Sequence, residues 1–199
     1  MIKRSSKAVK SHRKKEKCML KSRWMVLGAA MLLGISAFGN RRALAADNPT
    51  DAQIVGIVLA ADQIDIDYAK IALAKSKDKQ VREFANRMVT DYSAVQKSVV
   101  ALAENRGVKA EDSGTSNGLK SGAADVTAKL KSLRGKEFDK FYIDNEVAYH
   151  KSVTDAVDTV LIPSAQNSEL KAALQGAQPL FLKHLEHAHS IQSGGAMSH

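Results

Sequence analysis

Apolar residues recur every three or four positions along most of the chain after residue 50, which is the spacing of amphipathic helices. No Val/Ile/Thr-rich stretch alternates apolar and polar residues in the manner of a half-buried strand. We therefore predict an all-α protein with four long helices and one short one. The long helices are expected at about Thr50–Lys75, Lys79–Arg106, Lys136–Ile162 and Asn167–Gln192, and the short helix at Leu119–Leu133.

The expected helix ends carry recognisable start and stop residues. Thr50–Gln53 has the pattern of a capping box, and Asp78 is placed to cap the second helix. Gly107 should end the second helix, and Pro163 should end the third, because the residue before a proline avoids the helical conformation. Pro179 lies inside the fourth helix, where its missing N–H is expected to kink the chain.

Four long helices with one apolar stripe each predict a four-helix bundle. Only a few residues join the first helix to the second and the third to the fourth, so each pair should form an antiparallel hairpin. The second and third helices are separated by residues 107–135, of which 107–118 are expected to be a loop. A helix of 26 residues is about 39 Å long, and this connection is long enough to return along the bundle. The sequence therefore favours the ferritin-like topology, with a long crossover and parallel middle helices.

The positive charge of the chain is concentrated at its start. Residues 1–45 hold 12 of the 30 Lys/Arg and one of the 21 Asp/Glu, which leaves 18 bases, 20 acids and a net charge of −2 for the remainder. The overall charge of +9 therefore belongs to a leader and not to a binding surface. We exclude nucleic acid as a partner on this ground.

The leader has the layout of a secretory signal. A basic stretch precedes the 15-residue apolar run Met25–Gly39, which is shorter than the roughly 20 residues of a membrane-spanning helix. Ala43-Leu44-Ala45 is a small-x-small cleavage signal, so we predict cutting between Ala45 and Ala46, with cutting after Gly39 as the alternative. The domain would then be residues 46–199, with its core at about 50–192 and no cysteine, in the periplasm or otherwise exported. Membrane attachment would require an uncleaved leader.

Ionisable residues fall on the inner faces of the expected helices. Asp65 and Asp91 lie 12 residues before and 14 residues after the turn near residue 77, while Glu146 and His184 each lie 19 residues from the turn near residue 165. With parallel middle helices, these positions share one level of the bundle. The predicted cluster comprises Asp65, Asp91, Glu146, His150, His184 and His187.

Two hypotheses account for such a cluster, since a buried charge needs either a partner or a metal. In the first, Asp91 or Glu146 holds a protonated histidine, and Glu146→Ala should then cost about 3–5 kcal/mol of stability. In the second, the carboxylates and imidazoles bind iron, manganese or zinc.

The cluster lacks the Glu-x-x-His pairs of two-metal bundles, because His150 follows Glu146 by four residues. No Glu lies three residues before His184 or His187, and Glu186 faces about 100° or more away from the inner side. No nucleotide-binding glycine pattern, nucleophile elbow or Cys-x-x-Cys pair occurs.

Three stretches resemble the bacterial family DUF4142, a domain of unknown function. They are VREFANRMVTDYSAV (Val81–Val95), FDKFYIDNEVAYH (Phe138–His150) and NSELKAALQGAQPLFLKHLEHA (Asn167–Ala188). The resemblance spans most of residues 50–192 and implies export to the cell envelope and a ferritin-like bundle. It also implies an Asp-His pair on the second helix and an early Glu, where this chain has Asp91-Tyr92 and Asp65.

The leader, the near-neutral remainder and the lack of catalytic motifs together favour a non-enzymatic, exported bundle with a structural or binding role. Its partner in the envelope is not specified by the sequence, and self-association would be compatible with the helical faces. The competing expectation is a ferritin-like protein that binds Fe, Mn or Zn, with a possible redox role, through the inner cluster.

Overall fold

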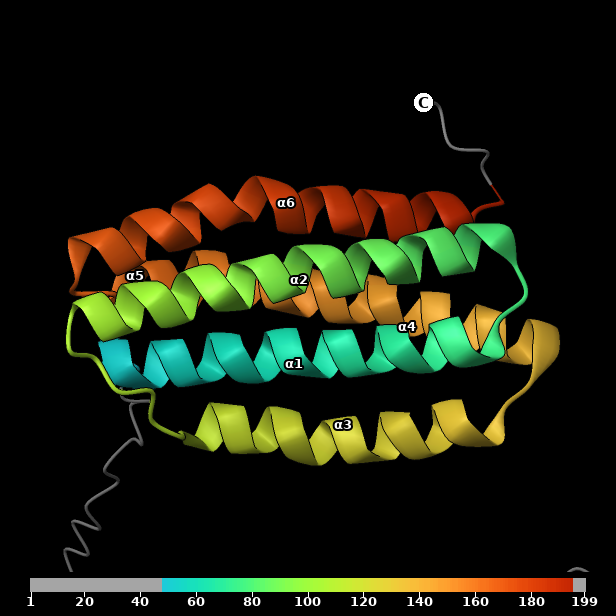
Figure 1. The fold of residues 1–199 in the computed structure, drawn as a ribbon, viewed down its shortest axis with the longest axis horizontal. Helices are drawn as coiled ribbons and strands as arrows, with labels where there is room; N and C mark the ends of the chain where they lie inside the picture. Colours follow the sequence, from blue (N-terminus) through green and yellow to red (C-terminus); the bar gives the residue numbers. More distant parts are fainter. Residues whose placement is uncertain (1–47, 195–199) are drawn as a thin grey trace, which may run out of the picture. The chain divides into compact units, whose positions relative to one another are not determined.

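The computed structural model describes residues 48–194, which fold into helices without a strand in that range (Figure 1). The all-α prediction is confirmed. The leader and its predicted cleavage point at Ala45 and Ala46 lie outside the described residues. The elements are α1 (Asp51–Lys75), α2 (Lys79–Asn105), α3 (Gly114–Ser132), α4 (Gly135–Ala156), the π-helical turn η1 (Val157–Leu161), the short α5 (Ile162–Ser164) and α6 (Ser168–Gln192).

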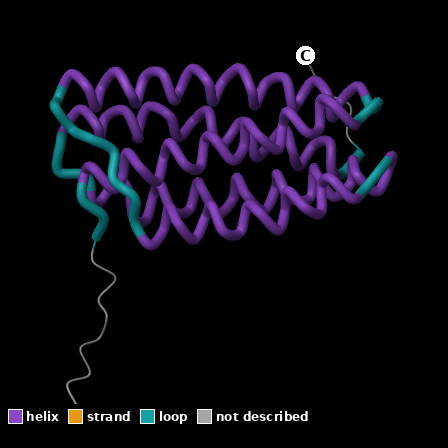
Figure 2. The backbone as a smooth tube through the Cα atoms, turned by 60° about the horizontal axis from the view of Figure 1, so that its bottom comes forward, coloured by secondary structure: helices purple, strands orange, loops and turns teal. Residues whose placement is uncertain are grey.

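The helices lie side by side, with their connections gathered at the two ends of the bundle (Figure 2). α1 and α2 form one antiparallel pair, and α4 and α6 form another (Figure 1). α3 follows α2 in the chain and runs back along the outer side of α1, so α2 and α4 run in the same direction. None of the described helices has the length and apolar character needed to cross a membrane.

The predicted capping residues begin the helices as expected. Thr50 and Gln53 form a reciprocal capping box at the start of α1. The Asp78 carboxylate accepts the first free backbone N–H groups of α2, and the Asn167 side chain does the same for α6. Gly107 follows α2 with a φ of 64°, a left-handed conformation that costs glycine little.

Two sequence-based boundaries are wrong. The segment 107–118 is not wholly a loop, because Ser113 and Ser116 form a second capping box that starts α3 at Gly114. Pro163 does not end the third long helix. The chain first widens into the π-helical turn Val157–Leu161, and Pro163 then occupies the opening of the next short turn, where no N–H is required.

α3 is attached to α1 at both ends. At its start, the Glu111 backbone N–H donates to the carbonyl of Ala52 over 3.0 Å. At its end, the Lys75 ammonium donates to the carbonyls of Leu130 and Lys131, over 2.7 and 2.6 Å. The lysine thus supplies donors and positive charge to the C-terminus of α3, where both are needed.

The two halves of the bundle are packed differently. Near the α1–α2 turn, Phe84, Phe138, Tyr142 and Met88 are all fully buried. The other half is lined mainly by small and aliphatic side chains and contains a cavity of about 1410 Å³. Several of its lining residues, among them Ala148, Ser152 and Gly176, are exposed, so this cavity is open to solvent.

Candidate metal centre

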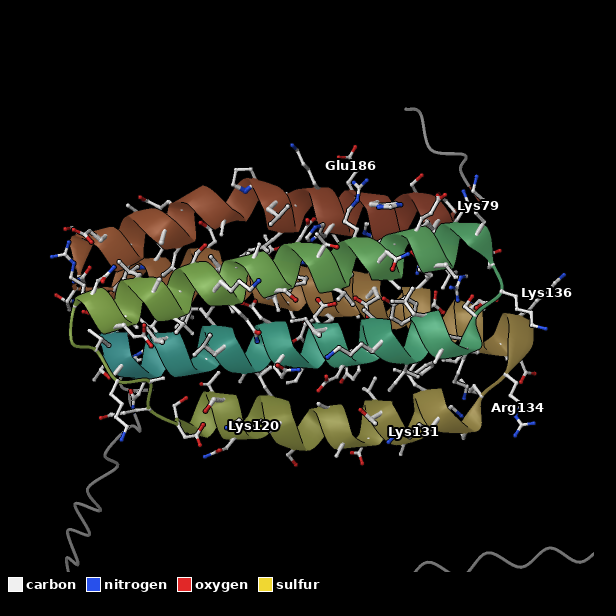
Figure 3. The ribbon with its side chains drawn as sticks, in the orientation of Figure 1. Lys79, Lys120, Lys131, Arg134, Lys136 and Glu186 are labelled. Carbon is white, nitrogen blue, oxygen red and sulfur yellow. The ribbon has the colours of Figure 1, made fainter. Side chains whose placement is uncertain are left out.

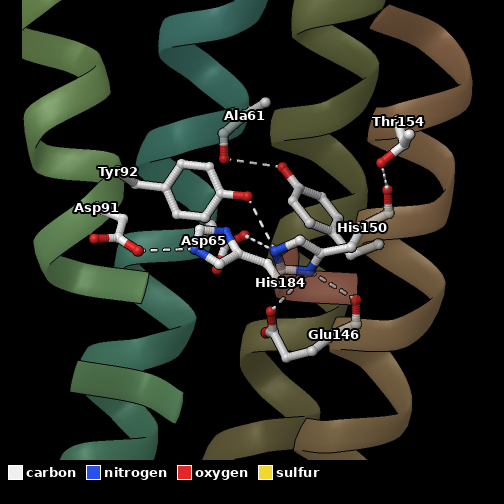
Figure 4. Close-up of polar contacts among 9 residues, drawn as sticks. Ala61, Asp65, Asp91, Tyr92, Glu146, His150, Thr154 and His184 are labelled. Carbon is white, nitrogen blue, oxygen red and sulfur yellow. Dashed lines mark hydrogen bonds and ion pairs between the residues drawn. The ribbon is translucent and has the colours of Figure 1, made fainter. Parts of the chain in front are cut away.

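Three ionisable side chains meet in the middle of the bundle. Asp65 comes from α1, while Glu146 and His150 come from successive turns of α4, and none of the three is exposed. One ligand atom from each lies within 4.8 Å of the others (Figure 4). The Nε2 atom of His150 is 3.5 Å from an Asp65 oxygen, and its Nδ1 atom is 3.6 Å from a Glu146 oxygen.

Hydrogen bonds on both sides orient the His150 ring. Its Nδ1 lies 2.8 Å from the backbone carbonyl of Glu146, which can only accept, so Nδ1 carries the proton. Its Nε2 lies 3.0 Å from the Tyr92 hydroxyl and accepts from it. The unprotonated nitrogen therefore faces Asp65. Metal-binding histidines are usually held in this way, with the second ring nitrogen donating to a backbone carbonyl.

The carboxyl groups lack such partners. All four side-chain oxygens of Asp65 and Glu146 are buried without a hydrogen bond. Burial raises the pKa of Asp65 to about 7. Burial, and then the nearby Asp65 carboxylate, raise the pKa of Glu146 well above its usual value. Burial also lowers the pKa of His150 to about 4. Without a bound cation, Asp65 and Glu146 therefore favour their protonated forms, and His150 favours its neutral form.

A second pair lies beside this group. The Nε2 atom of His184, on α6, is 2.9 Å from an oxygen of the half-buried Asp91 on α2 (Figure 4). The His184 and His150 rings meet edge to face with centroids 5.6 Å apart. His187 packs instead against Phe84, with both ring nitrogens unpartnered. The six predicted residues are thus arranged as a buried triad, an adjoining pair and one histidine further along α6.

Comparison with known families bears on this geometry. Residues 39–191 match the family described as domain of unknown function DUF4142. The chain belongs to the DUF4142 family. The matched range contains all six cluster residues and every described helix except the last residue of α6. No curated protein and no solved structure matches the chain.

Sequence reasoning missed one acid of this DUF4142 domain. Asp62 is 2% exposed, because α3 covers a second face of α1 on which Val55, Ile66 and Ala69 are also buried. Its Oδ2 atom has no partner. Burial, and then Asp65, raise its pKa to about 8. The sequence did contain a signal for this burial. Val55 and Ile66 lie seven residues before and four residues after Asp62, so all three share a second, mainly apolar face of α1.

Sequence reasoning also treated the tyrosines only as apolar stripe residues. The Tyr92 hydroxyl contacts His150, and the Tyr149 hydroxyl donates to the carbonyl of Ala61 over 2.9 Å. Tyr68 packs edge-on against Tyr149, and Tyr142 packs against Phe84. Burial raises the pKa of Tyr92 and Tyr142 well above 10, so both remain neutral donors at physiological pH. The four tyrosines thus form a shell around the triad.

These pKa shifts give the metal-free domain a defined pH dependence. Between about pH 7 and pH 8, native Asp62 and Glu146 retain protons that the unfolded chain has already released, so the free energy of unfolding falls as the pH rises. The buried histidines act in the opposite direction, but mainly below their ordinary pKa of about 6.5. Each retained proton changes the free energy of unfolding by about 1.4 kcal/mol per pH unit, so we expect this free energy to fall by about 1–2 kcal/mol between pH 7 and pH 8.

Urea unfolding in EDTA at a series of pH values measures this dependence. Asp62→Asn should flatten the curve above pH 7, whereas Asn at the exposed Asp67 should leave it unchanged. A stability that rises from pH 7 to pH 8 would show that these acids are ionised in the native domain.

Proposed function

We propose that this chain is an exported metal-binding bundle protein in which Asp65, Glu146 and His150 hold one divalent iron, manganese or zinc ion. The observation that carries the proposal is the convergence of three ligand atoms within 4.8 Å at a fully buried position. The four carboxyl oxygens there make no hydrogen bond of ordinary length. Native proteins rarely leave buried polar atoms unsatisfied, so such a group needs an explanation, and a cation supplies one.

The donor set suits these ions. Two carboxylates and one neutral imidazole provide oxygen and nitrogen ligands, and their charge of −2 neutralises a divalent ion in the core. Ligands at about 2.0–2.2 Å from an ion lie at most about 4.4 Å apart. Small side-chain movements would therefore bring the triad to coordination distance, and the Tyr92 hydroxyl would have to release the His150 Nε2 atom, whose single lone pair it now occupies. Binding would release the protons that the acids carry in the metal-free state.

Internal pairing is the rival explanation, and the contacts favour it for only one of the two groups. Asp91 and His184 are within hydrogen-bonding distance, as that hypothesis expects. Glu146, by contrast, does not hold a protonated histidine, because His150 is satisfied by Tyr92 and a backbone carbonyl and its pKa is lowered. We assign the pair a structural role and the triad the binding role.

The wider assignment rests on topology and on the leader. The shared direction of α2 and α4, with α3 as the return segment, supports a ferritin-like bundle. The basic and apolar leader supports export to the periplasm or cell envelope. A non-enzymatic role is proposed because no nucleophile, base or nucleotide-binding motif accompanies the triad.

Elemental analysis of the full chain, purified without a histidine tag, tests the proposal. We expect about one iron, manganese or zinc per chain and a higher melting temperature when the depleted protein is reloaded. His150→Leu should lose both effects. Leucine at His189, which is exposed on α6, should lose neither. A content below about 0.1 metal per chain, without a melting shift for any of the three ions, would refute the proposal.

A further inference from the structure

The cavity in the loosely packed half of the bundle is not lined by any of the three triad residues. It extends between α1, α2, α3, α4 and α6. Its volume, about 1410 Å³, exceeds the roughly 300–1,000 Å³ of most small-molecule sites. Along α4 and η1 it runs from Asn145 to Leu161, a distance of about 24 Å at the rise of a helix. Its dimensions therefore suit an extended ligand rather than a compact one.

Small residues on α3 and α4 keep the cavity open. Gly118 and Gly122 are one turn apart on α3, and a Cβ atom at either would meet nothing within 4 Å. Ala148, Ser152 and Ala156 line the cavity at every fourth position of α4. Larger side chains at these positions would fill the space. The small residues therefore leave an open channel with an apolar lining along α3 and α4.

The cavity also has a polar end, near the middle of α1 and α4. Asp62 and Asn145 both line it, and each has a buried atom without a partner, Oδ2 in Asp62 and Nδ2 in Asn145. The Asp62 side chain is almost completely buried. An amide N–H that needs an acceptor and a carboxyl oxygen that needs a donor together match a hydroxyl group, which can satisfy both.

Charge further restricts the ligand. Asp65 and Glu146 lie behind this end of the cavity, Asp91 also lines it, and no described base is among its lining residues. An anionic head group would add a negative charge to a region already rich in buried acids. A cationic ammonium head could donate to Asp62 but has no acceptor for the Asn145 amide, so it would satisfy only one of the two groups.

We propose that the cavity binds an amphiphile with an alkyl chain and an uncharged hydroxyl head, the chain lying along the small residues of α3 and α4 and the hydroxyl between Asp62 and Asn145. The metal triad is not required for this binding. The site therefore gives the domain a lipid-like ligand in addition to the proposed ion.

Calorimetric titration of the full chain with decanol, decanoate and decylamine at pH 7 tests the proposal, because the three probes differ only in their head group. We expect decanol to bind at least tenfold more tightly than either charged probe. Gly122→Phe should abolish decanol binding by filling the path, whereas Ala124→Phe, on an exposed part of α3, should not. Asp62→Leu should weaken decanol binding about tenfold.

The outcomes are separable from those of the metal test. Circular dichroism and metal content, measured on the same samples, identify a variant that has lost its fold or its ion. Decanol binding that survives Gly122→Phe in a folded protein would overturn the proposal, as would decanoate binding as tight as that of decanol. A dimer that excludes decanol in sedimentation experiments would assign the cavity to a second copy of the chain and would also overturn it.

Discussion

Replacing Glu146 with leucine is expected to abolish metal binding while leaving the metal-free domain at least as stable as the natural chain. The Glu146 carboxyl is fully buried, and neither of its oxygens has a hydrogen-bond partner. Leucine of similar size removes two unsatisfied polar atoms, for which the desolvation penalty is about 1–3 kcal/mol each. We therefore expect a gain of about 1–3 kcal/mol in EDTA.

The same substitution removes one of three metal ligands. Changes to groups that only orient a ligand already lower metal affinity about 10–100-fold, so the loss for Glu146→Leu should exceed about 100-fold. Urea unfolding with EDTA and with excess manganese or zinc measures both effects. In the natural chain the ion should stabilise the fold, and in Glu146→Leu it should have no effect.

Leucine at Glu186 is the matched control, because this residue points away from the bundle on α6 (Figure 3). It should change neither metal affinity nor stability by more than about 0.5 kcal/mol. The sequence alone led to the opposite expectation for Glu146→Ala, a loss of about 3–5 kcal/mol from a stranded histidine. Such a loss for Glu146→Leu in EDTA would mean that the glutamate pairs with a charged His150 after all.

Gly56→Ala is expected to destabilise the domain by about 2–3 kcal/mol, although alanine favours helices over glycine by about 1 kcal/mol. A Cβ atom at residue 56 would lie 2.0 Å from the carbonyl oxygen of Glu111 and 2.9 Å from its carbonyl carbon. These are backbone atoms and cannot rotate away. The segment before α3 would have to leave α1, with loss of the bond from Glu111 to Ala52.

Gly176→Ala provides the comparison within the same fold. Residue 176 is also inside a helix, α6, and a Cβ atom there would meet nothing within 4 Å. It should therefore show the ordinary gain of about 0.5–1 kcal/mol. Urea midpoints of the two variants measure the difference. A stabilising Gly56→Ala would show that the Glu111 segment does not rest on α1.

The sequence predicted the helices well because their signals are local. Capping at Thr50, Asp78 and Asn167 depends on a few neighbouring residues, and those contacts are present in the structure. The π-helical turn Val157–Leu161 has no comparable signal, because it depends on how the helix packs rather than on a residue that stops it. The expected end at Pro163 was wrong for that reason.

Helical periodicity was enough to predict which residues of the site lie together. Spacing and level placed Asp65, Glu146 and His150 together, and the structure brings them within contact distance. Periodicity could not show which partner each acid lacks, since that depends on side-chain directions on several helices. The burial of Asp62 and the large cavity depend on where α3 packs, which is a property of the assembled fold.

The tyrosine shell allows the metal site to be followed by intrinsic tyrosine fluorescence. Tyr68, Tyr92, Tyr142 and Tyr149 are all the tyrosines of the chain, and its single tryptophan, Trp24, precedes the expected cleavage point. In a chain cut at the predicted point, every remaining tyrosine lies within or beside the triad and no tryptophan is left. Quenching or recovery of tyrosine fluorescence would therefore follow occupancy of the site directly, without any attached dye.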